Sequence, residues 1–319
     1  MLQNETLRIE GDGNLKEKAA NLKAFVDSND DPAHSANLKS LHDDRIEAIV
    51  DLLDQICVQR QYMDCHEFLL LLLNALKIMC RKECNRSILS SRVLNLILNL
   101  IDDHTADDEI LRQCANVLLN ACHSEAFVQR LIEAKRTTTL IRLLESKNDC
   151  IAYAAAGAMK NITYHEGGPR IALPAIAAIV ALLGPDRPRN ARGRAIGIVH
   201  NITIDAEATR LVQRHHALPL IVELLKAEYD LDTRASAAGA IQNVANDTST
   251  RWIINDLGAI DLLSELVVSA HPVAQANAIG ALWNLVQPNL AEGVIDAQVY
   301  KSALSGSIAA AIMLNLDAE

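Results

Sequence analysis

Aromatic side chains are scarce in this sequence. Phe, Trp and Tyr make up 3% of the 319 residues, whereas half of all residues are apolar. Leu, Ile, Val and Ala must therefore fill the interior, as is typical of close-packed helices with few strands. Cysteines number only 7, and an odd number does not suit a disulfide framework. We expect thiols buried as small apolar side chains in a reducing compartment, the cytoplasm and alternatively also the nucleus.

The sequence also lacks a basic surplus, a long apolar run and a catalytic motif. Its formal net charge is −10, which argues against nonspecific binding to nucleic acid. The apolar run Phe68–Leu73 is too short to cross a bilayer, and Met1–Glu10 lacks the apolar block of a signal peptide. No phosphate loop, HExxH motif or nucleophile elbow is present. We therefore expect a soluble, non-enzymatic protein that needs no metal or cofactor.

The most informative feature is a pattern that recurs about every 41 residues. Segments such as RASAAGAIQNV and AYAAAGAMKNI combine small apolar residues with an asparagine near the end. The asparagines in register are Asn120, Asn161, Asn201, Asn243 and Asn284. Four of them follow a glycine by four residues, at Gly157, Gly197, Gly239 and Gly280. A fixed period of this length indicates a helical solenoid, in which each unit buries its apolar faces on its neighbours.

Each unit contains a short first helix, a second helix ending in an aliphatic pair, a polar turn and a long third helix. The predicted repeats are approximately 46–91, 92–135, 136–173, 174–216, 217–258 and 259–300, within one domain over 40–319. We expect residues 1–39 to be a partly ordered leader, with a helix at Leu15–Val26, that caps the first repeat. A final helix is predicted at Ser305–Asp317, in an incomplete unit over 301–319 that leaves self-association open.

Two units depart from the pattern. In the first, Asn74 and Lys77 are alternative register positions one helical turn apart, and the sequence does not decide between them. After Asn161, glycines and prolines interrupt the stretch Gly167–Pro174, where a first helix belongs. We expect that helix to be short or absent.

A three-helix unit of about 41 residues with A-A-G-A-x-x-N in its last helix resembles the armadillo repeat family. The resemblance covers roughly residues 46–316 and implies an all-α, right-handed α-solenoid of about six three-helix repeats. It further implies that the third helices line a concave groove, where their asparagines hydrogen-bond the backbone of an extended partner segment. That role would fall to Asn161, Asn201, Asn243 and Asn284. It would fall less clearly to Asn120, because the residue four positions before it is Asn116, whereas the other four repeats have glycine at that position.

A carboxamide suits this role because it offers one acceptor and two donors to a passing strand. The alternative is that the asparagines tie neighbouring helices together or cap their own helix. The glycines are likewise open to two interpretations, close helix packing or space for a ligand backbone. In nuclear-import adaptors of the family this position is typically tryptophan, so the sequence is more similar to the catenin-type or scaffold branch.

One basic cluster stands out in this acidic chain. Arg187, Arg189, Arg192 and Arg194 precede Asn201; Arg194 shares the face of that asparagine, whereas Arg192 points roughly opposite. Guanidinium groups suit carboxylates and phosphates, so one hypothesis is that an acidic or phosphorylated partner segment passes here. The alternative is that these arginines pair with the chain's own acids.

We therefore predict a scaffold that binds an extended protein segment through the asparagines. Specificity would come from flanking residues, namely Lys160, His200, Gln242, Trp283, Arg194 and Arg192. The alternative is a regulator or chaperone that holds a folded partner, such as a small GTPase or a cytoskeletal or motor protein, at edge residues. His123, His165 and His200 recur near the same helix end, but repeats about 10 Å apart are too distant to share one zinc ion.

Overall fold

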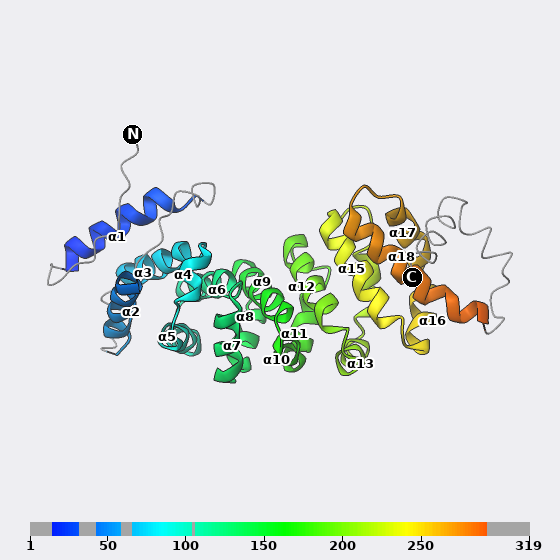
Figure 1. Cartoon of the computed structure of the whole chain (residues 1–319), viewed down its shortest axis with the longest axis horizontal. Helices are drawn as coiled ribbons and strands as arrows, with labels where there is room; N and C mark the ends of the chain where they lie inside the picture. Colours follow the sequence, from blue (N-terminus) through cyan, green and yellow to red (C-terminus); the bar gives the residue numbers. More distant parts are fainter. Residues whose placement is uncertain (1–14, 32–42, 59–65, 104–105, 292–319) are drawn as a thin grey trace. The chain divides into compact units, whose positions relative to one another are not determined.

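The computed structural model describes residues 15–31, 43–58, 66–103 and 106–291, and every element in these ranges is a helix (Figure 1). The chain divides into two compact units, Met1–Ile171 and Ala172–Glu319. Among the described helices, none has the length and apolar character needed to span a membrane. The predicted helix at Ser305–Asp317, and the incomplete last unit that contains it, lie outside the described residues.

The first unit is built around long third helices that pack on one another. α3 (His66–Met79) packs against α6 (Asp108–Ala121), and α6 packs against α9 (Asp149–Tyr164). Small residues on these helices, such as the buried Ala154 and Ala158 of α9, let the helix axes approach closely. The remaining helices of this unit are α1 (Leu15–Asn29), α2 (Asp43–Val58), α4 (Glu83–Ser87), α5 (Ser91–Asp102), α7 (Glu125–Ala134), α8 (Thr137–Leu144) and α10 (Gly168–Ala172).

The second unit repeats this arrangement. α12 (Arg189–Ile202) packs against α15 (Leu231–Val244), and α15 packs against α18 (Pro272–Ala291). Ala237, Ala238 and Ala240 of α15 are fully buried in this stack. The shorter elements are the 3-10 turn η2 (Leu173–Ala175) and the helices α11 (Ile176–Ala181), α13 (Ala206–Arg214), α14 (Leu218–Glu223), α16 (Thr248–Asp256) and α17 (Ala259–Val267).

Short polar side chains fix where many of these helices begin. The Asp107 carboxylate accepts a hydrogen bond from the Ile110 N–H at the start of α6, and Asp230 accepts one from the Thr233 N–H at α15. Asn148, Asp205 and Asp247 cap α9, α13 and α16 in the same way. Each cap satisfies an N–H group that the helix itself leaves without a partner. The polar turns between the helices thus supply the residues that start the next helix.

The first helix after Asn161, in the stretch interrupted by glycines and prolines, is short, as predicted. This helix, α10, has 5 residues, whereas the equivalent α7 has 10. Gly167 adopts φ +76°, a conformation that side chains rarely tolerate. A Cβ atom on Gly168 would lie 1.9 Å from the Ile162 carbonyl oxygen, so only glycine permits this close backbone approach. The two glycines therefore shorten the helix by allowing a tight turn directly after α9.

The predicted leader helix is present as α1, which packs along α3. Among the side chains of α1 that are described, Leu22, Phe25 and Val26 are buried. At its C-terminal end, the Arg81 guanidinium donates to the carbonyl oxygens of Asn29 and Asp30 at 2.7 and 2.9 Å. A basic side chain that binds the last carbonyls of a helix stabilises that end. The leader helix α1 thus covers α3, which is the third helix of the first repeat.

Candidate functional site

In the first unit, the asparagine side chains connect successive third helices. The Nδ2 atom of Asn120 on α6 donates to the Lys77 carbonyl oxygen on α3 at 2.9 Å. On α9, Asn161 donates in the same way to the Leu119 carbonyl oxygen on α6 at 3.0 Å. Its Nδ2 also lies 3.1 Å from His123 Nε2. Each asparagine therefore reaches back to the main chain of the preceding third helix.

The second unit has the same connection. Asn243 Nδ2 on α15 donates to the His200 carbonyl oxygen on α12 at 3.0 Å, and Asn284 on α18 donates to the Gln242 carbonyl oxygen on α15 at 2.8 Å. A second asparagine of α18, Asn277, donates to the Ala235 carbonyl oxygen at 2.9 Å. Asn201 lies half-buried at the equivalent position of α12. Tying of neighbouring helices, one of the two alternatives, is thus a real role of this ladder.

These hydrogen bonds also fix the register of the first unit. Asn161, Asn243 and Asn284 each reach the residue directly before the ladder position of the preceding helix. Asn120 reaches Lys77, so the ladder position of α3 is Ile78. Both predicted positions, Asn74 and Lys77, are wrong. Because position 78 holds isoleucine and not asparagine, the repeat of asparagines in the sequence could not identify it as the ladder position.

Tying uses only part of each carboxamide. Nδ2 carries two N–H donors and Oδ1 can accept two hydrogen bonds. The hydrogen bonds of Asn120, Asn161, Asn243 and Asn284 to the preceding third helices use Nδ2 and leave Oδ1 out of the tie. Because the tie holds each side chain in one orientation, these oxygens are positioned acceptors. The arrangement can accept N–H groups from a passing backbone without losing the contacts between repeats.

The register glycines make room for side chains of the preceding third helix. A Cβ atom on Gly239 would lie 2.4 Å from His200 Nε2, and one on Gly280 would lie 2.4 Å from Gln242 Nε2. His200 and Gln242 directly precede the ladder asparagines of their own helices. At these two positions, therefore, close helix packing explains the glycine. The predicted specificity residues His200 and Gln242 lie across these glycines and stay half-buried.

We use the name ladder face for the residues at the ladder position and at positions −8, −7, −4, −1 and +3 relative to it. On an α-helix these positions span a sector of about 120°. On α9 and α15 it is the side that reaches the surface. Between Thr233 and Val244 of α15, the half-buried residues are Ser236, Gln242 and Asn243. Between Ile151 and Ile162 of α9, they are Tyr153, Lys160 and Asn161.

Lys160, Trp283 and Arg194, which the sequence proposed for partner binding, are half-buried on this face. Arg192 is not on it, and its predicted role in partner binding is wrong. Its side chain is 5% exposed, and the guanidinium donates to the Tyr229 hydroxyl and lies 5.0 Å from the centre of that ring. Burial raises the pKa of the Tyr229 hydroxyl, which therefore stays protonated at neutral pH.

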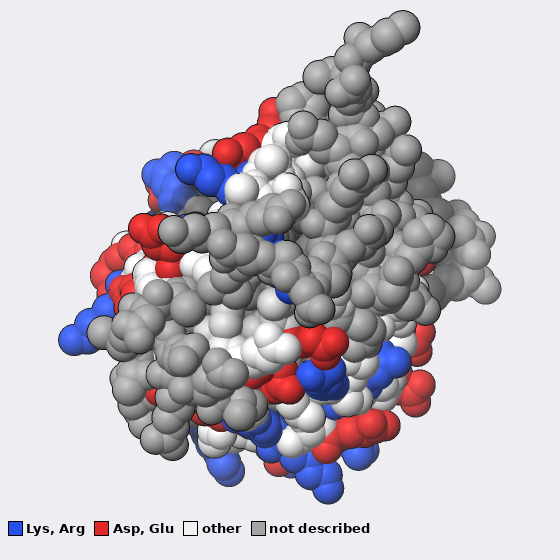
Figure 2. Space-filling model, turned by 90° about the vertical axis from the view of Figure 1, so that its left-hand side faces the viewer, with Lys and Arg blue, Asp and Glu red and all other residues white. Residues whose placement is uncertain are grey.

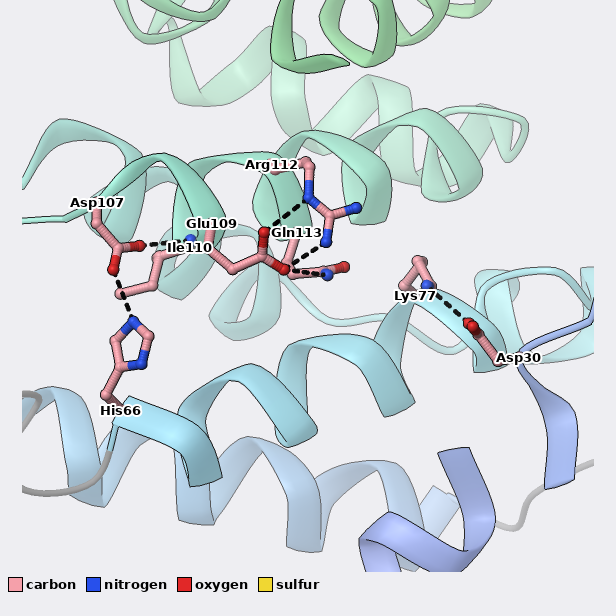
Figure 3. Close-up of polar contacts among 8 residues, drawn as sticks. All are labelled: Asp30, His66, Lys77, Asp107, Glu109, Ile110, Arg112 and Gln113. Carbon is pink, nitrogen blue, oxygen red and sulfur yellow. Dashed lines mark hydrogen bonds and ion pairs between the residues drawn. The ribbon is translucent and has the colours of Figure 1, made fainter. Parts of the chain in front are cut away.

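Several contacts between repeats were not predicted. Arg192 also pairs with Glu223 at 3.4 Å, and Arg234 pairs with Glu265 at 3.3 Å in the same register one repeat later. At the opposite end from the asparagines, His66 Nε2 lies 2.7 Å from the Asp107 carboxylate (Figure 3). The recurrence of Arg–Glu pairs 31 residues apart was the available sequence signal.

The histidines near the ladder make hydrogen bonds. His123 contacts Asn161, as described above, and His165 Nε2 lies 3.3 Å from the Cys122 carbonyl oxygen. In the part of the chain that the structure describes, no group of three His, Cys, Asp or Glu residues could hold a metal ion.

Comparison with known proteins supports the fold. No protein-family model and no curated protein sequence matches the chain. Among solved structures, a designed armadillo repeat protein is similar with a TM-score of 0.65 and 23% identity, over 74% of this chain and 99% of that one. A second designed armadillo repeat protein, in complex with the peptide (KR)4, has a TM-score of 0.62 and 23% identity, over 74% and 98%. The chain has the armadillo-repeat fold.

Proposed function

We propose that this chain is a non-catalytic scaffold that binds an extended segment of a partner protein along the ladder face. The observation that carries the proposal is the set of ladder asparagines in each unit, fixed through Nδ2 by ties in which Oδ1 takes no part. An extended backbone presents N–H groups at regular intervals, so it can meet successive acceptors independently of its side chains. A similar designed armadillo protein is in complex with a peptide, which supports this mode of binding.

The test removes two asparagines from one unit. Asn201→Ala with Asn243→Ala should weaken capture of the partner in an affinity pull-down, because each lost hydrogen bond contributes about 1 kcal/mol. Since Asn243 also ties α15 to α12, circular dichroism and thermal melting must first show that the variant is folded. Asn95→Ala with Asn190→Ala, at exposed positions outside the ladder face, is the matched control. Equal capture by the folded ladder variant and the control would contradict the proposal.

A second candidate function, holding a folded partner, is favoured by one observation. On and just after α16, Trp252, Ile253 and Leu257 are 51%, 49% and 37% exposed. Large exposed apolar side chains often mark a protein contact surface. This candidate predicts that Trp252→Ser reduces partner capture whereas the double asparagine variant does not. Intact capture by Trp252→Ser would count against it.

A further inference from the structure

The ladder face differs in charge from the rest of this acidic chain. The sequence has 40 acidic and 30 basic residues, yet no ladder-face position on α3, α6, α9, α12, α15 or α18 is Asp or Glu. The basic residues at these positions are Lys77, Arg81, Arg112, Lys160 and Arg194. In the view of Figure 2, Lys and Arg side chains lie interleaved with Asp and Glu side chains among the residues that are described. The basic residues are concentrated in the first unit, which has four of the five, and one of these, Arg112, is paired with Glu109; the second unit has Arg194 alone. The ladder face of the first unit is therefore the one that favours negatively charged groups.

The chain's own acidic turn lies on this face. Asp30 follows the last residue of α1, and its carboxylate lies 3.2 Å from Lys77 Nζ (Figure 3). The Lys77 side chain is only 16% exposed, so the pair is partly shielded from water. Arg112 lies on the next third helix, α6. Its pKa is raised, mainly by its hydrogen bond with Glu109, and the charge of Asp30 contributes as well.

The same turn also uses its main chain. The Asn29 and Asp30 carbonyl oxygens accept hydrogen bonds from Arg81, at position +3 relative to Ile78. An acidic segment therefore already binds the first step of the ladder face by combining a carboxylate with backbone carbonyls. This combination of carboxylate and backbone contacts is the one expected of an acidic partner segment.

We infer that the ladder face of the first unit accepts an extended anionic segment of a partner, and that the acidic turn at Asp30 competes for it. The inference rests on the proposed function and adds the chemistry of the partner. The negative charges could come from Asp and Glu or from phosphorylated residues, and both suit lysine and arginine. Loss of the Asp30 carboxylate should free Lys77 for the partner. Loss of a basic ladder-face residue should weaken binding.

The experiment titrates the full chain with three fluorescent dodecapeptides of alternating Asp and Glu, alternating phosphoserine and Gly, and alternating Lys and Arg, followed by anisotropy. We expect at least one anionic peptide to bind and the basic peptide to bind more weakly. Asp30→Asn should tighten anionic binding about threefold, and Lys160→Glu should weaken it about tenfold. The matched controls carry the same charge changes off the ladder face: Asp261→Asn and Lys226→Glu should leave affinity close to wild type.

The relative affinities of the two anionic peptides identify the source of the charge. Preference for the basic peptide, or equal effects of the ladder-face variants and their controls, would overturn the inference. The proposed function would survive if a peptide of any charge bound less well to the folded Asn201→Ala, Asn243→Ala variant. If no peptide bound in a ladder-dependent manner, both would fail.

Discussion

The imidazole of His200 occupies the space into which a Cβ atom at Gly239 would project. That atom would lie 2.4 Å from Nε2, inside any acceptable contact distance. One repeat later the Gln242 carboxamide lies against Gly280 in the same way. The two glycines thus have the same role but different neighbours, one a rigid ring and the other the end of a flexible side chain.

This difference predicts unequal effects of alanine. A helical Gly→Ala change gains about 1 kcal/mol in helix propensity, whereas overpacking costs about 1–3 kcal/mol. We expect Gly239→Ala to lower the free energy of unfolding by about 1 kcal/mol, because the ring must move. Gly280→Ala should be close to neutral, because Gln242 can turn away. Urea unfolding measures both.

A double variant checks the cause. In a His200→Ala background the obstruction is absent, so adding Gly239→Ala should raise the free energy of unfolding toward the propensity gain of about 1 kcal/mol. If Gly239→Ala were equally destabilising with and without the imidazole, packing against His200 would not explain the glycine.

Two arginines, two residues apart on α12, should behave differently. Arg192 is buried against Tyr229 and Glu223, so Arg192→Ala should destabilise the protein by on the order of 2 kcal/mol. Arg194 lies half-buried on the ladder face, and we expect Arg194→Ala to change stability by less than about 0.5 kcal/mol. Thermal melting of the two variants makes the comparison. Equal losses would mean that the two side chains share one structural role.

The five cysteines whose side chains are described should react in two classes. Cys80, Cys114 and Cys122 are buried, and burial raises the pKa of the Cys80 thiol to about 12. Cys84 and Cys150 are exposed. Because the thiolate is the reactive form, a brief treatment of the native protein with iodoacetamide should modify Cys84 and Cys150 before these three buried cysteines, as peptide mass spectrometry would show. Early labelling of Cys122 would contradict its buried position.

Acid should weaken the start of α16. Hydrogen bonds from the Ser249 hydroxyl and the Thr250 N–H lower the pKa of Asp247 below its ordinary value of 3.8. The Asp247 carboxylate therefore binds a proton more tightly in the unfolded chain than in the folded one. The ionised cap stabilises the folded state above about pH 4, and this stabilisation is lost as the pH falls through the folded-state pKa of Asp247. Asp247→Asn keeps a capping oxygen without the charge. Urea unfolding should show that the variant loses less stability than wild type between about pH 5 and pH 3; an identical loss would exclude the cap.

The repeat architecture followed from the sequence because it depends on local features. The spacing of Asn161, Asn243 and Asn284 set the period, and residues such as Asp107 and Asp230 marked helix starts. Both signals act within one repeat or recur at a fixed interval. They are therefore readable without knowledge of which faces meet.

The contacts between repeats were harder to predict because they depend on which side chain fills a given gap. The packing of His200 on Gly239 joins residues 39 apart, and no local rule connects them. The sequence did not reveal that Ile78 occupies the ladder position of α3, because this position lacks the asparagine of the other repeats. Asn120 nevertheless donates to the carbonyl oxygen of the neighbouring Lys77, as its counterparts do in later repeats. Helical spacing placed Arg192 off the ladder face, but its burial requires Tyr229, which belongs to the next repeat.

The most direct test of the proposed function is to locate the partner on the surface. A photo-crosslinking amino acid placed at Gln242 lies on the ladder face, whereas one placed at Trp252 lies on the exposed apolar surface of α16. Irradiation of each variant with the captured partner, followed by mass spectrometry, reports which surface the partner touches. Binding along the asparagines predicts crosslinks from Gln242 and few from Trp252. Crosslinks from Trp252 alone would contradict it.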